Sequence, residues 1–205
     1  MSRYAPDHKQ QTRDRVLSVA AVQMRERGPQ GVAVASVMAD AGLTHGGFYA
    51  HFSSRDAFVE AVLERMFEES PADVLRPTEP SEPRDVLRAF VDVYLSRAHR
   101  DTRTAGCPLP FLTSDANRLP AGAHDRLASG ISGMHALLAK QLTKLDHVNA
   151  DALAASCMAE VVGAITLSRA MTNRAESDRL LLHCRESLYA RLGLTLKSRE
   201  TDESC

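Results

Sequence analysis

The feature that most constrains the fold is a closely spaced series of helix signals and breaks near the N-terminus. Apolar residues at helical spacing predict an amphipathic helix over Asp7–Arg27, which Gly28–Pro29 ends. Its apolar stripe consists of Val16, Leu17, Ala20, Ala21 and Met24. A short helix over Val34–Ala41 follows, Gly42 turns the chain, and Thr44–Phe52 forms another short helix that Thr44 caps. This arrangement is the helix-turn-helix pattern.

Helical spacing continues through the rest of the chain, where runs of alternating or β-branched residues are scarce. The prolines between Pro71 and Pro83 predict a linker or domain seam. Further helices are predicted from a cap at Ser53 or Ser54 to Met66, and over Val86–His99, Leu109–Asn117, Ala121–Leu145, Ala150–Met171 and Glu176–Leu192. We therefore expect an all-α protein, with a helix-turn-helix domain over 1–70 (motif at about 33–52) and a helical domain over 71–205.

The composition is that of an ordinary soluble protein, since 44% of its 205 residues are hydrophobic and 25% are charged. It excludes a mainly disordered chain, and a net charge of −1 excludes a protein coated in positive charge. Residues 1–56 carry +2 and the remainder −3, which hints at an electrostatic role for the N-terminal quarter. The polar N-terminus, and Glu160 and Arg169 within the longest apolar stretch, predict a cytoplasmic protein with no membrane contact.

The second short helix of the motif would present polar and small residues that suit a major groove. The hydroxyls of Thr44 and Tyr49 can reach phosphates, and His45 can donate to or accept from a base edge. Gly46 and Gly47 let the backbone approach the bases, although each costs roughly 1 kcal/mol in a helix. The candidate DNA-binding residues are Thr44, His45, Gly46, Gly47, Tyr49, His51 and Arg55. A loop followed by a fraying helix would also fit this spacing.

The run Gly42–Phe58, GLTHGGFYAHFSSRDAF, resembles the signature of TetR/AcrR-type transcriptional regulators. That signature is roughly Ala-Gly-Val-Ser, a variable residue, Gly, a variable and a hydrophobic residue, Tyr, two variable residues, Phe, and then a Ser/Asn-Lys-Glu segment. Residues upstream also sit where the family ends its first helix and places its second: Arg27, Gly28, Val34, Val37, Ala41 and Gly42. The resemblance covers about residues 9–68, and beyond them it extends only to length and helical character.

The resemblance implies a homodimeric repressor that binds a palindromic operator on double-stranded DNA and an unknown small-molecule effector. Carried over by position, Thr44, Tyr49 and Arg55 look like phosphate contacts. The base-facing residues would be His45, Gly46 and Gly47, and the structural ones Phe48 and Phe52. The chain departs from the family at Val32–Ala33, where a capping Thr or Ser is usual, and Arg55 replaces the usual Lys.

Apolar residues of the second domain could line an effector cavity, or could simply form core. The candidates are Phe90, Tyr94, Cys107, Phe111, Met134 and Met158. Cys107 stands between Gly106 and Pro108, just before a predicted short helix, and Arg100 and Arg103 are near in sequence. A thiol at a helix N-terminus has a lowered pKa and is nucleophilic. We expect either a thiol that senses oxidants or electrophiles, or a small half-buried residue at a helix start.

The last two helices combine small residues with apolar area, which predicts a four-helix bundle across a twofold axis. The candidate interface residues are Leu153, Cys157, Val161, Ala164, Ile165, Leu181, Cys184 and Leu188. Such a dimer would place two recognition helices on two half-sites of a palindrome. The same helices could instead form the core of a monomer.

The histidines and cysteines show no metal-ligand spacing, so we expect neither a metal nor another cofactor. The sequence predicts a DNA-binding repressor, not an enzyme, which a small molecule or modification of Cys107 releases from its operator. One alternative is a thiol-dependent redox enzyme using Cys107, which needs a base or resolving cysteine that the sequence does not show. Another is a protein-binding helical module, which leaves Gly46, Gly47 and Tyr49 unexplained.

Overall fold

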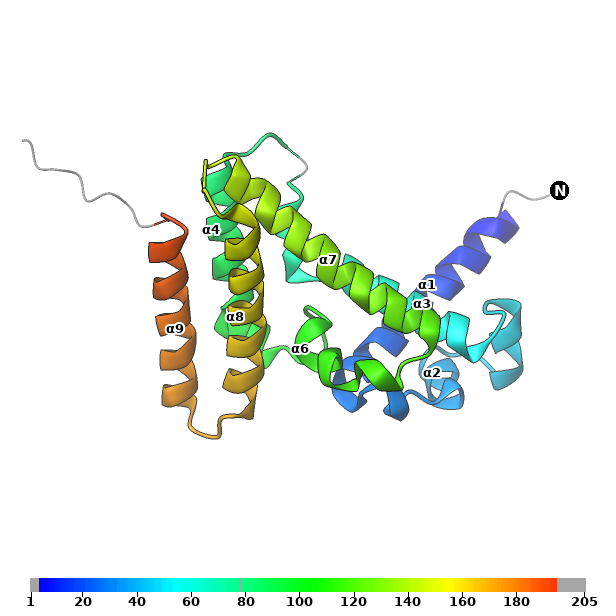
Figure 1. The fold of residues 1–205 in the computed structure, drawn as a ribbon. Helices are drawn as coiled ribbons and strands as arrows, with labels where there is room; N and C mark the ends of the chain where they lie inside the picture. The colour runs from blue at the N-terminus through cyan, green and yellow to red at the C-terminus, as the bar shows by residue number, and fades with distance from the viewer. Residues whose placement is uncertain (1–3, 78, 195–205) are drawn as a thin grey trace, which may run out of the picture.

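The computed structural model describes residues 4–77 and 79–194, and every regular element in these stretches is a helix, which confirms the all-α prediction (Figure 1). The α-helices are α1 (Tyr4–Arg27), α2 (Val34–Asp40), α3 (Arg55–Glu68), α4 (Pro83–Tyr94), α5 (Arg97–Asp101), α6 (Leu109–Leu112), α7 (Ala121–Thr143), α8 (Ala150–Ala170) and α9 (Arg174–Arg191). The 3₁₀ helices are η1 (Pro29–Gly31), η2 (His45–Ala50), η3 (Pro71–Leu75) and η4 (Thr113–Arg118). The C-terminal segment from Thr195 to Cys205 lies outside the described residues.

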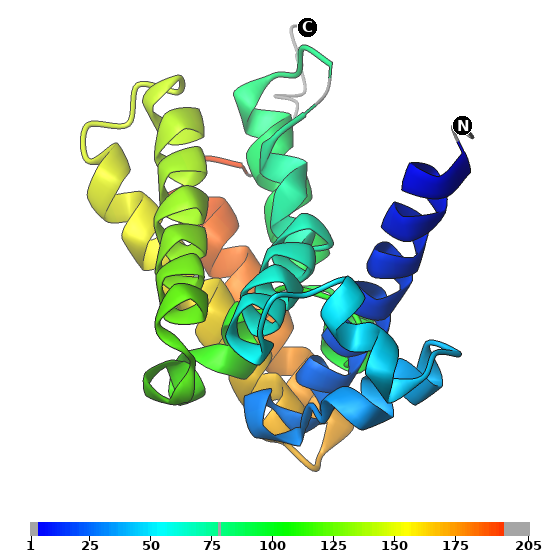
Figure 2. The ribbon, with the colours of Figure 1, turned by 90° about the vertical axis from the view of Figure 1, so that its right-hand side faces the viewer.

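The helices gather into two groups that α7 connects. Helices α1, α2 and α3 lie together at one end, and α4, α8 and α9 stand side by side at the other (Figure 1). Helix α7 runs obliquely from the first group to the second and packs against α3, α4 and α8. The N-terminal half of α1 projects away from the rest of the molecule in both views (Figure 2).

An aromatic cluster holds the N-terminal group together. The ring of Phe58, from α3, lies edge-on to Phe48 and Phe52, with centroids 5.3 Å and 4.8 Å away. These three rings and the side chains of Met24 and Met38 are buried. Edge-to-face aromatic pairs contribute stability beyond that of the apolar area they bury. Because Phe48 and Phe52 lie between α2 and α3 and Phe58 lies in α3, this cluster holds the connection between the two helices in place.

The turn after α2 follows the predicted chemistry. Gly42 has a φ of 72°, a left-handed conformation that favours glycine. Its N–H donates to the Ala39 carbonyl at 2.9 Å, and the Leu43 N–H donates to the Met38 carbonyl at 2.8 Å. These two bonds form a Schellman motif, which ends α2 sharply and sets the direction of the next element.

The predicted helix over Thr44–Phe52 is instead the short 3₁₀ helix η2, and Thr44 does not cap it with its side chain. The N–H of Gly47 donates to the Thr44 carbonyl and that of His51 to the Phe48 carbonyl, each at 3.0 Å. The glycine pair explains the difference, because two adjacent glycines are poor α-helix formers. The next predicted cap is confirmed, since the Ser54 hydroxyl accepts from the Ala57 N–H at the start of α3.

The proline-rich stretch is only in part a linker. Its first half forms η3, which packs on α4 and α7 and buries Leu75. The helix predicted over Val86–His99 is divided between α4 and α5. Ser96 causes the division, because its hydroxyl accepts from the His99 N–H at 3.0 Å and starts α5.

Helix α8 forms the middle of the second group, between α7 and α9. By length and composition alone it is the one helix in the described stretches that could cross a membrane. In this fold its residues Ala154, Cys157, Val161 and Ile165 face the neighbouring helices and are buried. Packing within the bundle therefore accounts for part of the apolar sequence of α8.

We predict that Phe58→Ala destabilises the N-terminal group by ~3–5 kcal/mol, because it empties the centre of the aromatic cluster. Denaturant unfolding measures the change. The control is Val93→Ala on α4, an exposed site where the change should stay within about 0.5 kcal/mol. Equal effects of the two substitutions would contradict this role for the cluster.

Candidate DNA interface and effector cavity

The helix-turn-helix unit presents η2 at the surface. Tyr49 is 72% exposed, and Thr44, His45 and Gly46 are exposed beside it. A Cβ atom on Gly46 would meet nothing within 4 Å, so this backbone is open to a close partner. Gly47 is half-buried, and a Cβ there would lie 3.6 Å from the Met38 side chain. One glycine therefore faces outward and the other lies against α2.

Two further candidate residues flank η2. Arg55 is exposed at the first turn of α3. His51 is half-buried, and burial holds its pKa below the usual value, with a further lowering by the positive charges of Lys9 and Arg13 on α1. Lys9 and Arg13 are missing from the predicted site, although their four-residue spacing on one helix face could have drawn attention to them.

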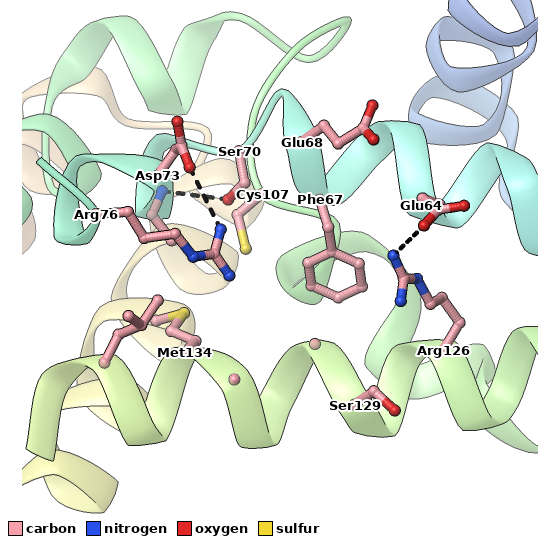
Figure 3. Close-up of a pocket in the computed structure, with 14 residues that line it drawn as sticks. Glu64, Phe67, Glu68, Ser70, Asp73, Arg76, Cys107, Arg126, Ser129 and Met134 are labelled. Atoms are coloured by element: carbon pink, nitrogen blue, oxygen red, sulfur yellow. Dashed lines mark hydrogen bonds and ion pairs between the residues drawn. The ribbon is translucent and has the colours of Figure 1, made fainter. Parts of the chain in front are cut away.

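A cavity of about 180 Å³ lies between α3, η3 and α7 (Figure 3). Phe67 points into it from α3, Met134 lies on α7, and the Cys107 thiol reaches it from the loop before α6. Ion pairs lie at its edges, between Glu64 and Arg126 and between Asp73 and Arg76. These pairs are the charged residues shown with dashed lines in Figure 3. The cavity thus has an apolar middle and a charged rim.

Two glycines of α7 shape this cavity. A Cβ on Gly130 would lie 2.0 Å from the Phe67 ring, so this glycine lets the ring rest against α7. A Cβ on Gly133 would meet nothing within 4 Å, so this glycine leaves space empty. The sequence shows both as weak points of a long helix, but not which neighbour each one accommodates.

Two of the six predicted cavity residues line this cavity and four do not. Cys107 and Met134 line the cavity, whereas the rings of Phe90 and Tyr94 are fully buried in the core beside it. Phe111 lies beneath the Arg169 guanidinium, 4.2 Å from ring centroid to Cζ. Met158 is a half-buried residue of α8 and does not line the cavity either. Helical spacing identifies inward residues but does not separate core from cavity wall.

The expectation of a lowered pKa at Cys107 is wrong. The side chain is 1% exposed, and burial raises the pKa of its thiol above the usual value. Contacts with Tyr94, Leu109, Ser70 and Arg169 act in the opposite direction but are smaller. The helix that follows, α6, spans Leu109–Leu112 and is too short for a strong dipole. Arg100 does not help either, because it pairs with acidic residues elsewhere.

Arg25 connects the loop of Cys107 to the helix-turn-helix unit. It lies near the end of α1, is 2% exposed, and donates from Nε to the Gly106 carbonyl at 3.2 Å. Its Nη1 donates to the Thr104 carbonyl at 3.2 Å and to the Glu69 carboxylate at 3.0 Å. Its Nη2 donates to the Met66 carbonyl at 3.4 Å. One buried guanidinium therefore joins α1, the end of α3 and the loop beside the cavity.

His99 holds the other side of this loop. Its Nδ1 lies 2.7 Å from the Tyr94 carbonyl oxygen, and its Nε2 accepts from the Cys107 N–H at 3.4 Å. Burial lowers its pKa to about 4, so the ring is neutral near pH 7. Gly106 has a φ of 114°, and a Cβ there would lie 2.7 Å from the His99 ring. The loop therefore fits tightly between Arg25 and His99.

The predicted dimer interface needs correction. Six of its eight residues are at most 4% exposed within one protomer, where no partner could reach them: Cys157, Val161, Ala164, Ile165, Leu181 and Leu188. For these six, the alternative interpretation as protomer core fits the structure, because α8 packs on both α7 and α9. Leu153 and Cys184 are half-buried. The exposed apolar side chains of this region are Leu167, Met171 and Leu182.

Comparison with known proteins agrees with this arrangement. Residues 16–62 match the profile of bacterial regulatory proteins of the tetR family, and residues 83–184 match the tetracyclin repressor-like C-terminal domain. An HTH-type transcriptional repressor of Mycobacterium tuberculosis is 27% identical over 100 residues, which cover 45% of this chain and 53% of the relative. The match thus spans about half the length of that relative.

Solved structures share the fold. A TetR transcriptional regulator from Chloroflexus aurantiacus superposes with a TM-score of 0.77 at 23% identity, over 91% of this chain and 96% of the other. The reduced form of NemR from Escherichia coli gives a TM-score of 0.75 at 21% identity, over 88% and 96%. A helix-turn-helix unit joined to such a helical domain defines a DNA-binding transcriptional regulator. The chain belongs to the TetR family.

We predict that Cys107 in the folded protein reacts with an aromatic disulfide reagent more slowly than the half-buried Cys184, because its side chain is only 1% exposed and the reagent cannot reach it. Mass spectrometry of proteolytic fragments after timed labelling measures both rates. Labelling in denaturant is the control, and there the two rates should converge. Faster reaction at Cys107 in the folded protein would show that this thiol is activated after all.

Proposed function

We propose that this protein is a homodimeric repressor that binds a palindromic operator through η2 and leaves it when a small molecule occupies the cavity between α3 and α7. The observation that carries the proposal is the exposure of η2, with Tyr49 outward and Gly46 open, on a rigid aromatic support. Residues 1–70 would be the DNA-binding domain and 71–205 the effector-binding and dimerisation domain. The relatives whose names include repressor or regulator support this role.

The contacts follow from the chemistry of the exposed groups. The Tyr49 hydroxyl and the Arg55 guanidinium suit phosphates, because both are hydrogen-bond donors on flexible or protruding side chains. His45 suits a base edge, since its ring can donate or accept. Thr44 and the backbone around Gly46 and Gly47 would lie closest to the groove, with His51 at its margin.

Dimerisation would use the outer faces of α8 and α9. Leu167 and Leu182 are 58% and 45% exposed, and Met171 is exposed at the end of α8. Exposed large apolar side chains on neighbouring helices favour association with a second copy. Half-buried Leu153 and Cys184 would contribute at the margins of this interface.

The cavity suits a small amphipathic molecule. Its volume of about 180 Å³ is below the roughly 300–1,000 Å³ of drug-sized sites, its middle is apolar, and its rim is charged. An occupant would press on Cys107, which is adjacent to the Gly106 carbonyl that Arg25 holds. A ligand that prefers the displaced loop shifts the population toward protomers whose α1 and η2 are misplaced for DNA.

Release by modification of the Cys107 thiol is the weaker of the two routes. A buried thiol with a raised pKa is a poor nucleophile toward oxidants and electrophiles. The same facts disfavour a thiol-dependent redox enzyme that uses Cys107. Occupation of the cavity by a small molecule requires no ionised thiol.

We predict that the double variant Tyr49→Phe/Arg55→Ala weakens binding to all duplexes about equally, because phosphate contacts carry no sequence information. His45→Ala should instead change which sequences are preferred. Selection from a random duplex library, followed by fluorescence anisotropy with the selected duplex, measures both effects. Wild-type affinity in the double variant would overturn the proposed function.

We predict that Gly133→Leu weakens DNA binding, because the added side chain enters the empty space and imitates a bound effector. The matched control is Ala136→Leu, an exposed position three residues further along α7, which should leave binding unchanged. Anisotropy titrations with the selected duplex compare the two. Unchanged affinity in a folded Gly133→Leu variant would show that filling the cavity does not release the protein from DNA.

A further inference from the structure

The part of α1 that projects from the molecule lies beside the recognition element. Arg13 places its guanidinium carbon 5.1 Å from the centroid of the Phe52 ring, directly after η2. Lys9 is exposed one helical turn earlier on the same face. Both charges are close enough to His51 to disfavour its protonated form. Lys9, Arg13 and His51 therefore form one group, which we call the α1 basic face.

Acidic residues nearby do not neutralise this face. Asp14 accepts from Arg65 at 2.8 Å and from Gln10 at 3.0 Å, so it is engaged on another side of α1. Asp7 precedes Lys9 by two residues, which puts it on the opposite side of the helix. Within the described residues, no carboxylate forms an ion pair with Lys9 or Arg13.

The two cations of the α1 basic face lie on one side of the helix, with Lys9 exposed and Arg13 half-buried. Nδ1 of His51 has no hydrogen-bond partner among the described residues, but it is shielded from solvent, so an anion would meet the outer side of this face. Two like charges close together on a surface are stabilised by an anion that brings acceptor oxygens. Tyr49 of η2, two residues before His51, is one of the exposed residues that the proposed function places on DNA. The anion expected at this position is therefore a DNA phosphate.

We infer that Lys9 and Arg13, with His51 between α1 and η2, hold a phosphate of the DNA backbone beside the groove that η2 enters. The inference rests on the proposed function and adds a contact from the first helix to those of the helix-turn-helix. The short helix η2, His45–Ala50, contains no Lys or Arg, so α1 supplies positive charge beside it. Such contacts raise affinity for every sequence alike.

The test is the salt dependence of binding to a random-sequence duplex of about 30 base pairs, because each cation that neutralises a phosphate adds about 0.9 to the slope of log K against log salt. Lys9→Gln and Arg13→Gln should each lower the slope by about 0.9 per protomer, and the double variant by about twice that. Arg15→Gln is the matched control. It removes the same charge from an exposed position of α1 that faces away from Arg13, so its slope should equal that of the wild type.

The outcomes separate this inference from the proposed function. If the wild type shows no salt-dependent binding, the proposed function fails. If the wild type binds but the double variant keeps its slope, the α1 contact is wrong and the function stands. Because Arg13 packs on Phe52, its variant could lose structure. In that case Lys9→Gln alone, which changes an exposed side chain, tests the α1 contact. Arg13→Lys keeps the charge and should keep the wild-type slope.

Discussion

The buried guanidinium of Arg25 is the interaction on which the arrangement of the two helix groups depends. Charges are costly to bury unless they are paired and hydrogen-bonded, and this one meets the Glu69 carboxylate and three backbone carbonyls. The carbonyls of Thr104 and Gly106 belong to a loop about 80 residues away in sequence, and that of Met66 to the end of α3. Few placements of α1 relative to this loop allow all four hydrogen bonds of Arg25 to form at once.

Helix α3 extends from the candidate DNA-binding surface to the cavity. It begins at Arg55 beside η2 and carries Phe67 into the cavity, so one helix about 21 Å long spans both candidate sites. The loop of Cys107 is the wall of the cavity that also touches Arg25. A structural change at the cavity can therefore affect η2 through two sets of contacts, one along α3 and one from the Cys107 loop through Arg25 to α1. Packed cores transmit such shifts because they hold few voids.

Much of the fold could be predicted from the sequence, because local rules determine it. Helical spacing gives the helices, and Gly42 and Ser54 mark where α2 ends and α3 begins. What the sequence could not give depends on contacts between distant segments. The four bonds of Arg25, the space at Gly133, and the burial that reverses the expected pKa shift of Cys107 all come from residues far along the chain. Periodicity likewise shows that α8 and α9 have apolar faces but not which faces pair within a protomer.

The proposed coupling of the cavity to the DNA-binding surface through Arg25 can be measured with a double-mutant cycle on DNA affinity. Arg25→Lys keeps the charge but loses the fork that reaches both loop carbonyls. Gly133→Leu is then measured in the wild-type and in the Arg25→Lys background, with the same selected duplex. A marked loss of affinity is expected in the first background and a clearly smaller loss in the second, where only the contacts along α3 remain. Equal losses in both would show that the cavity acts on DNA binding without Arg25.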